Sequence, residues 1–388
     1  MKIDHTSLCG LLLATLMLVP ISPIWPALGV PGTYLAVLLY VSYAFLSRSI
    51  SEDIVWGLMI FIILVLVSLI PVLFGSHILS LALLLQLLLA IIFVFSIKKE
   101  HYHVLTKWLT FFIVITILGA YLSILWRALG GDELFTFSNP DGRANYIFPF
   151  SMTNSVWNNF LRPSGIFDEP GAFSFFICGT AFLRQLLGFN EKKTFAILVA
   201  GLVTLSLAHI VFTFLFFLSL KNRKHAFTLI VFATTIFLLV IIFGGLYQIF
   251  YDVFLIRFEL VDWSLHGDNR SAGFLVLYNY LLNNIDVFWF GVGPIIFLNE
   301  GLLQMVLNTT NEVGGNPLFI LFKHGIFLGF SYYATLLFLI YCGLTKSNLR
   351  WIYFGFALLL CQRDYLFVLG YSFLIVLIMR LSFNFFLK

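Results

Sequence analysis

The sequence predicts an all-α integral membrane protein that crosses the lipid bilayer many times. Of its 388 residues, 61% are hydrophobic and only 10% are charged, whereas a water-soluble globular domain has roughly 45–50% apolar and about 25% charged residues. An aromatic share of 18% and a mean hydropathy of +1.02 agree with this prediction. The composition excludes a disordered chain, a disulfide scaffold and a nucleic-acid-binding protein, and we expect residues 1–388 to form a single membrane domain.

The membrane-spanning helices are located by the apolar runs, because a helix needs about 20 residues to cross the hydrocarbon core. Two of these runs, 194–220 and 351–386, are interrupted by polar residues and flanked by basic residues. Because cytoplasmic segments carry an excess of Lys and Arg, each run is predicted to be a hairpin of two short helices. The first hairpin is expected to turn near 206–209, and the second, formed by 351–361 and 365–386, near 362–364. The remaining candidate spans are 8–29, 33–47, 54–74, 78–97, 108–127, 171–188, 226–250 and 317–343.

This arrangement gives about twelve transmembrane or half-spanning segments, with both termini in the cytoplasm. The inner side then carries 15 basic and 5 acidic residues and the outer side 7 basic and 13 acidic residues, which together account for the 22 basic and 18 acidic residues of the chain. All but one of the outer basic residues are arginines, which is the first indication of function. These residues are Arg127, Arg143, Arg162, Arg257, Arg270, Lys323 and Arg363.

Two of the predicted outer segments are long: the first long loop, 128–170, and the second long loop, 251–316. Neither shows an obvious regular pattern apart from 272–285, which carries asparagines on one side as an interfacial helix would. Both loops are rich in Trp, Phe, Tyr and Leu, which argues against disorder. Long loops that are not disordered are usually functional.

The densest group of reactive side chains is the string RPSGIFDEPG, which begins at Arg162. It combines a guanidinium group with two adjacent carboxylates, Asp168 and Glu169. One interpretation is structural, because acidic residues just before a helix that starts at Pro170 cap its first turn and complement its dipole. The other interpretation is functional, because a cap needs only one carboxylate and charge at the edge of a membrane is costly.

Arginines of both long loops form a second candidate site. Arg143 and Arg162 lie in the first long loop, and Arg257 and Arg270 lie in the second. Guanidinium groups bind phosphate oxygens through paired hydrogen bonds and stay charged when they are partly dehydrated. A set of them beside the outer leaflet therefore suits a lipid-linked diphosphate, although any one of them alone is more often a snorkelling or salt-bridged residue.

A third group of polar residues surrounds the start of the span 317–343. Glu312 and Asn316 precede this span, and Lys323 and His324 lie about two turns inside it. The His324 imidazole titrates near neutral pH and is a candidate general base. A helix-packing role, with the ring bonded to a backbone or hydroxyl group, is the alternative explanation.

Several absent patterns narrow the function. No nucleotide-binding loop and no metal-binding motif occurs in the chain, so we expect neither a cofactor nor a metal. A channel or a proton-driven carrier usually has charged residues in mid-membrane, whereas here the polar residues gather at the outer mouth. His209, near the first predicted hairpin turn, is a weaker candidate base. Chemistry at the outer face is therefore favoured over passage across the membrane.

The chain resembles the bacterial O-antigen polymerases of the Wzy family, within the wider group of O-antigen polymerases and ligases. The order and spacing of its motifs match those of the family over much of the chain. It departs from related ligases at Gly315, where a histidine often precedes Asn316, and at the first hairpin, which lacks a Ser-Arg pair. The residues that carry the resemblance are RPSGIFDEPGAFS (162–174), LVTLSLAHIVF (202–212), NRSAGF (269–274), FGVGP (290–294) and GNPLFILFKHGIFLGF (315–330).

The resemblance implies a helical architecture like that of the GT-C glycosyltransferases, in the bacterial inner membrane and with a periplasmic active site. The implied reaction joins oligosaccharide repeat units linked to undecaprenyl diphosphate and releases undecaprenyl diphosphate. Donor and acceptor glycans are then the partners, together with the lipid bilayer, and a chain-length regulator protein is a further candidate partner. Ligation of finished polymer to lipid A–core, or transport of the lipid-linked sugar by a flippase or permease, are the alternative functions.

The resemblance also assigns positions within the site. Arg162 and Glu169 match the family's first-loop motif, and Arg270 matches its second-loop arginine. From their chemistry we expect Arg162, Arg257 and Arg270 to bind the diphosphate and a carboxylate to orient or deprotonate the acceptor hydroxyl. The candidate catalytic residues are Glu169, Asp168, His324 and Glu312, and the further candidates for substrate binding are Arg143, Asn316 and Lys323.

Overall fold

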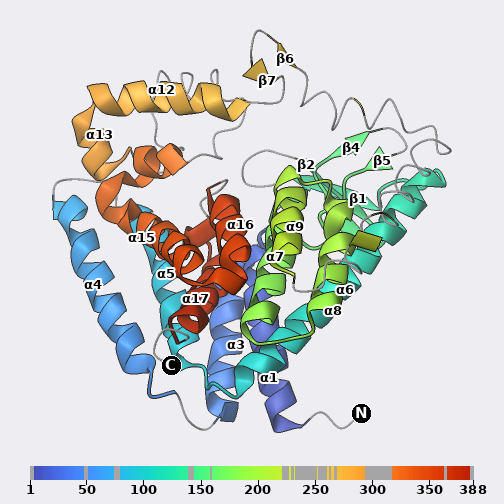
Figure 1. Ribbon diagram of the computed structural model, residues 1–388, viewed down its shortest axis with the longest axis horizontal. Coiled ribbons are helices and arrows are strands. Elements are labelled where there is room, and N and C mark those ends of the chain that lie inside the picture. The colour runs from blue at the N-terminus through green and yellow to red at the C-terminus, as the bar shows by residue number, and fades with distance from the viewer. Residues whose placement is uncertain are drawn as a thin grey trace.

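The apolar runs of the sequence fold into helices, which dominate the computed structural model of the chain (Figure 1). The structure describes residues 4–47, 51–73, 79–138, 144–157, 160–220, 227–228, 231, 251, 260–261, 264–265, 269–292, 317–361 and 365–384. The α-helices in these ranges are α1 (His5–Leu18), α2 (Ile24–Ala27), α3 (Gly32–Ser47), α4 (Ile54–Leu73), α5 (Leu79–Ser96), α6 (His101–Ala128), α7 (Pro170–Leu186), α8 (Glu191–Ala200), α9 (Leu207–Ser219), α12 (Asn269–Asn283), α13 (Ile285–Phe290), α15 (Pro317–Thr345), α16 (Arg350–Leu360) and α17 (Leu369–Asn384). The short 3-10 helices are η1 (Val19–Ile21), η2 (Gly201–Thr204), η5 (Ser347–Leu349) and η6 (Tyr365–Phe367).

The long loops are not free of strands, so the all-α prediction describes the helical bundle and not the whole chain. The first long loop contains a three-stranded antiparallel sheet in the order β1-β2-β3, followed by a separate β4-β5 hairpin. These strands are too short for an alternating pattern to reveal them in the sequence. The strands are β1 (Phe135–Ser138), β2 (Ala144–Phe148), β3 (Ser151–Thr153), β4 (Val156–Trp157), β5 (Phe160–Leu161), β6 (Leu260–Val261) and β7 (Ser264–Leu265).

Two predicted single spans are interrupted. The span 8–29 is not one helix: α1 ends at Leu18, because Pro20 lacks the backbone N–H that a longer helix requires. The span 317–343 corresponds to α15, which has a kink at Gly325, where φ is 64° and ψ is 178°. The predicted span 226–250 lies almost entirely outside the described residues.

The first predicted hairpin forms, but it turns earlier than expected. Helices α8 and α9 are separated by η2 and by Leu205, whose left-handed φ of 47° reverses the chain. Ser206 is the N-cap of α9, so His209 lies inside this helix and not in the turn. In the second hairpin, α16 and α17 approach through a hydrogen bond of 2.8 Å between the Tyr353 and Ser382 hydroxyls. The predicted turn at 362–364 lies outside the described residues.

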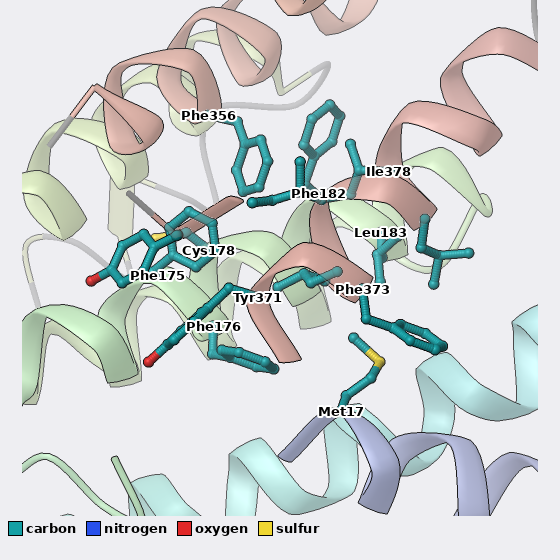
Figure 2. Packing of buried hydrophobic residues seen from close by; sticks show 14 of the residues in the cluster. Met17, Phe175, Phe176, Cys178, Phe182, Leu183, Phe356, Tyr371, Phe373 and Ile378 are labelled. Carbon is teal, nitrogen blue, oxygen red and sulfur yellow. The ribbon is translucent and has the colours of Figure 1, made fainter. Parts of the chain in front are cut away.

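Helix α7 lies at the centre of the bundle. All of its residues except Gly171 and Gln185 are buried, as expected of a helix that is apolar on every side. Its aromatic rings fill the space between α16 and α17, as Figure 2 shows for Phe182, whose ring centre lies 5.5 Å from that of Phe356. Because α7 contacts helices all around, the segment that leads into it is held by the whole bundle.

The helices at the periphery expose apolar side chains. Helix α6 buries one face through Leu109, Ile113 and Ile117 and exposes Phe111, Ile115, Leu118, Leu122 and Leu125, which share another face at three- and four-residue spacing. Helices α3 and α4 expose apolar stripes in the same way. Of the described helices, α6 and α15 are each long and apolar enough to cross a membrane.

The described parts of the two long loops lie at one end of the bundle. In Figure 1 the strands β1–β5 and the helices α12 and α13 lie at the top, whereas α1 begins and α17 ends at the bottom. Arg127 at the end of α6 and Arg162 before α7 belong to the loop end. The described basic residues of the opposite end are Lys98, Lys99, Lys107, Arg184, Lys192, Lys193, Lys346, Arg350 and Arg380.

An ion pair between a buried arginine and a partly exposed aspartate joins α17 to the residue before α4. Arg380 is 4% exposed, and its Nη2 lies 2.5 Å from Asp53 Oδ2.

Replacing Asp53 by asparagine removes the charge that faces this guanidinium, and we expect the free energy of unfolding to fall by about 1–3 kcal/mol. Thermal unfolding in detergent measures the loss. Glu100→Gln is the matched control, because its exposed pairing with Lys98 at 4.0 Å contributes about 1 kcal/mol or less; an equal loss for both variants would contradict this account.

Candidate functional site

The string that begins at Arg162 is an ordered segment between β5 and α7, which we call the 162–169 segment. After the β4–β5 hairpin the chain returns alongside β3. Met152 N donates a hydrogen bond of 2.7 Å to Gly165 O, and Ser164 N donates one of 2.8 Å to Met152 O. The segment is therefore paired with β3 through a short antiparallel bridge.

Small residues let the 162–169 segment lie directly against α6. Gly165 has a φ of 66°, and a Cβ added there would lie 2.1 Å from Thr116 Cγ2. Its N–H donates a hydrogen bond of 2.8 Å to Ser151 Oγ. Only glycine satisfies both the left-handed backbone and the close approach, so the glycine of the RPSG string fixes the position of the segment.

Phe167 anchors the other end of the segment. Its side chain is fully buried, and its ring centre lies 5.3 Å from that of Phe173 and 5.2 Å from that of Phe176. Ser164 Oγ lies 2.6 Å from Phe167 O. The backbone between Arg162 and Glu169 is thus held at both ends by the core and by β3.

Arg162 connects this segment to the turn between α8 and α9. Its Nε donates a hydrogen bond of 2.7 Å to Thr204 O, which lies in η2, and its side chain is partly exposed. Its backbone N–H donates to Ser155 O at 3.1 Å. The guanidinium is therefore oriented by a carbonyl of a different hairpin, whereas its charge stays accessible from the loop end.

The two carboxylates lie at the start of α7. Glu169 occupies the N-cap position, as the structural interpretation predicts, with φ −148° and ψ 156°, and Pro170 follows as the first helical residue. The Glu169 carboxylate makes no capping hydrogen bond to the first turn, although it is 94% buried. Asp168 is partly exposed. Capping by hydrogen bond thus does not explain Glu169, and a charged group is held beside the helix N-terminus, where the dipole favours it.

Lys323 and His324 lie in the first part of α15, next to its kink. A Cβ added at Gly291 would lie 2.6 Å from Gly325 N, and Val292 N donates a hydrogen bond of 2.8 Å to Phe322 O. This backbone contact with the end of α13 interrupts α15 directly after His324. The kink has no signal in the sequence, because it depends on two glycines far apart in the chain.

His324 and helix α7, into which the 162–169 segment leads, both contact η6. His324 is buried, and its ring centre lies 4.7 Å from that of Phe367. Tyr365 of the same 3-10 helix lies 4.4 Å, ring centre to ring centre, from Phe175 in α7. Arg162, Asp168 and Glu169 thus lie in one ordered segment, whereas His324 packs against η6, which in turn contacts α7.

The other predicted site residues are not described in a way that places their side chains. Arg143, Arg257, Glu312 and Asn316 lie outside the described residues, as does the side chain of Arg270, which is the second residue of α12. The expected gathering of arginines from both long loops therefore stays a prediction.

Arg162 contacts the first hairpin at Thr204, and the same hairpin carries the buried His209. Thr204 supplies the carbonyl that Arg162 contacts, and its buried hydroxyl has no hydrogen-bond partner within the described residues. His209 Nε2 lies 2.7 Å from Leu198 O, and its Nδ1 lies 3.5 Å from Cys178 Sγ. In the sequence, polar residues that interrupt the apolar run 194–220 mark this region, but they do not indicate that Arg162 contacts Thr204.

No protein-family model, no curated protein and no solved structure matches this chain.

Proposed function

We propose that the protein is an integral membrane protein of the bacterial inner membrane whose loop end faces the periplasm. The exposed apolar faces of α3, α4 and α6 support this proposal, because extensive exposed apolar surface marks a site of contact with a membrane or with another protein. The separation of the basic residues also supports it. The end of the bundle that holds Lys98, Lys192 and Lys346 is the more basic one, which is typical of a cytoplasmic side.

We further propose that the protein is an O-antigen polymerase, a glycosyltransferase that joins lipid-linked repeat units. The observation that carries this proposal is the 162–169 segment, whose rigid backbone holds a partly exposed guanidinium, the partly exposed carboxylate of Asp168 and the buried carboxylate of Glu169 at the loop end. Such a segment suits a diphosphate whose lipid chain stays in the bilayer. Arg162, with Arg257 and Arg270 of the second long loop, binds the diphosphate and stabilises the charge that develops on it.

The reaction breaks the bond between the anomeric carbon of the donor glycan and the oxygen of its diphosphate. A hydroxyl of the acceptor repeat unit forms the new bond to that carbon, and undecaprenyl diphosphate leaves with the bonding electrons. Glu169 or Asp168 orients the acceptor hydroxyl and takes its proton. The diphosphate leaving group supplies the driving force, so the transfer consumes no nucleotide.

Purified protein in liposomes with lipid-linked repeat units as the only glycan tests this function. We expect a ladder of glycans that differ by one repeat unit, together with free undecaprenyl diphosphate. A ligase forms no ladder, and transfers glycan only when lipid A–core is added. A flippase moves the lipid-linked unit across the bilayer without lengthening it. Either of these two results would contradict the polymerase proposal.

A further inference from the structure

The turn between α8 and α9 is held from two sides. From outside the hairpin, Arg162 Nε contacts Thr204 O. From inside, His209 reaches from the first turns of α9 to Leu198 near the end of α8. Between these two contacts the chain passes through Leu205, whose φ of 47° is the only positive value at a non-glycine residue among the described residues.

The contacts of His209 fix the position of its ring. A carbonyl oxygen only accepts, so Nε2 carries the hydrogen and donates to Leu198 O at 2.7 Å, and Nδ1 lies 3.5 Å from Cys178 Sγ. The His209 side chain has no exposed surface. The ring also packs on Gly201, where an added Cβ would lie 2.7 Å from His209 Cε1. His209 is therefore joined to α8, to η2 and to α7.

We propose that His209 is a positioning residue for Arg162. By holding Leu198 and Gly201 it keeps η2 and Leu205 in place, and with them the Thr204 carbonyl that orients the guanidinium toward the diphosphate. A left-handed conformation costs a residue such as leucine about 1–2 kcal/mol and persists only when its surroundings hold it. Without the His209 contact the turn relaxes, and the carbonyl no longer lies where Arg162 Nε reaches it. The assignment rests on the proposed function, because it concerns the orientation of the diphosphate-binding arginine.

Two substitutions separate the hydrogen bond of His209 from its volume. His209→Gln keeps an N–H donor near the position of Nε2, whereas His209→Leu keeps much of the volume and has no donor. In the liposome assay we expect His209→Leu to slow a single transfer by about 10- to 100-fold, because small displacements of a binding group have effects of this size. His209→Gln is expected to stay within about threefold of the wild-type rate.

A double-mutant cycle with Arg162→Ala tests whether His209 acts through Arg162. We expect His209→Leu to cause no further loss of rate in the Arg162→Ala background. An equal loss in both backgrounds, or equal impairment of the Gln and Leu variants, would overturn the proposal.

Hydrogen exchange of residues 201–206 gives a readout that does not need activity: it is expected to be faster in His209→Leu and unchanged in His209→Gln. A wild-type protein that forms no ladder while this exchange pattern holds would instead show that the proposed function fails and that His209 only holds the turn.

Discussion

Replacing Arg162 by alanine is expected to leave the protein folded and inserted in the membrane while cells make only single-repeat surface glycan. The guanidinium is proposed to stabilise the charge that develops on the leaving diphosphate. Removal of one such group from a preorganised site slows the chemical step by about 100- to 1,000-fold. The rate of a single transfer in liposomes and the length of the surface glycan on gels measure this effect.

Two further variants show whether the charge of Arg162 or its contact with Thr204 is responsible. Arg162→Gln has no charge but retains an N–H that can donate to the Thr204 carbonyl, which Arg162 Nε contacts at 2.7 Å. Arg162→Lys keeps the charge but has no planar fork for paired hydrogen bonds to phosphate. We expect the Gln variant to be as slow as the Ala variant and the Lys variant to be intermediate. Wild-type glycan length in the Gln variant would show that Arg162 only holds the α8–α9 turn and that its charge is not needed for transfer.

Replacing Gly165 by alanine is expected to destabilise the protein strongly. The left-handed backbone at Gly165, with φ 66°, disfavours alanine by about 1–2 kcal/mol. The new methyl group also meets Thr116 Cγ2 at 2.1 Å, and overpacking of this kind adds about 1–3 kcal/mol. We expect a loss of about 2–5 kcal/mol in total, measured by thermal unfolding, together with loss of transfer because the 162–169 segment shifts.

Two comparisons separate the backbone strain from the steric clash. Gly188→Ala adds a methyl at a similar φ of 72°, where no atom lies within 4 Å of the new Cβ, so it should show the strain alone. Combining Gly165→Ala with Thr116→Ser removes the clashing Cγ2 and keeps the hydroxyl that donates to Phe112 O at 2.8 Å. The double variant should recover the steric part of the loss. No recovery, together with equal effects at Gly165 and Gly188, would contradict the close packing of the segment on α6.

The sequence predicts the helices well, because a long apolar run satisfies its backbone polar groups only within a helix when it lies in an apolar environment. It also predicts that 194–220 is a hairpin, since basic residues flank that run at both ends. It misplaces the turn by about one helical turn, because Leu205 adopts a left-handed conformation that its residue type does not favour. The kink in α15 is invisible for a related reason: it forms where Gly325 meets Gly291, a contact between segments far apart in the chain.

The candidate site is predictable in its residue types and not in its connections. Arg162, Asp168 and Glu169 stand out because charge and turn-forming residues occur together at the end of an apolar run. One sequence does not reveal that Arg162 donates a hydrogen bond to the Thr204 carbonyl, because every residue has a backbone carbonyl. The strands that support the segment also escape detection, because their pairing is non-local and each strand is short.

The proposed function depends above all on the side of the membrane at which the 162–169 segment lies. Cysteine substitution followed by labelling with a membrane-impermeant maleimide measures this directly. Leu129 follows α6 at the loop end and is 79% exposed, and Lys192 lies at the start of α8, at the opposite end, and is also exposed. In cells whose outer membrane has been opened, we predict labelling of Leu129→Cys in the intact inner membrane and of Lys192→Cys only after this membrane is permeabilised. Labelling of Lys192→Cys but not of Leu129→Cys in the intact state, or of both, would contradict a periplasmic site for a lipid-linked diphosphate.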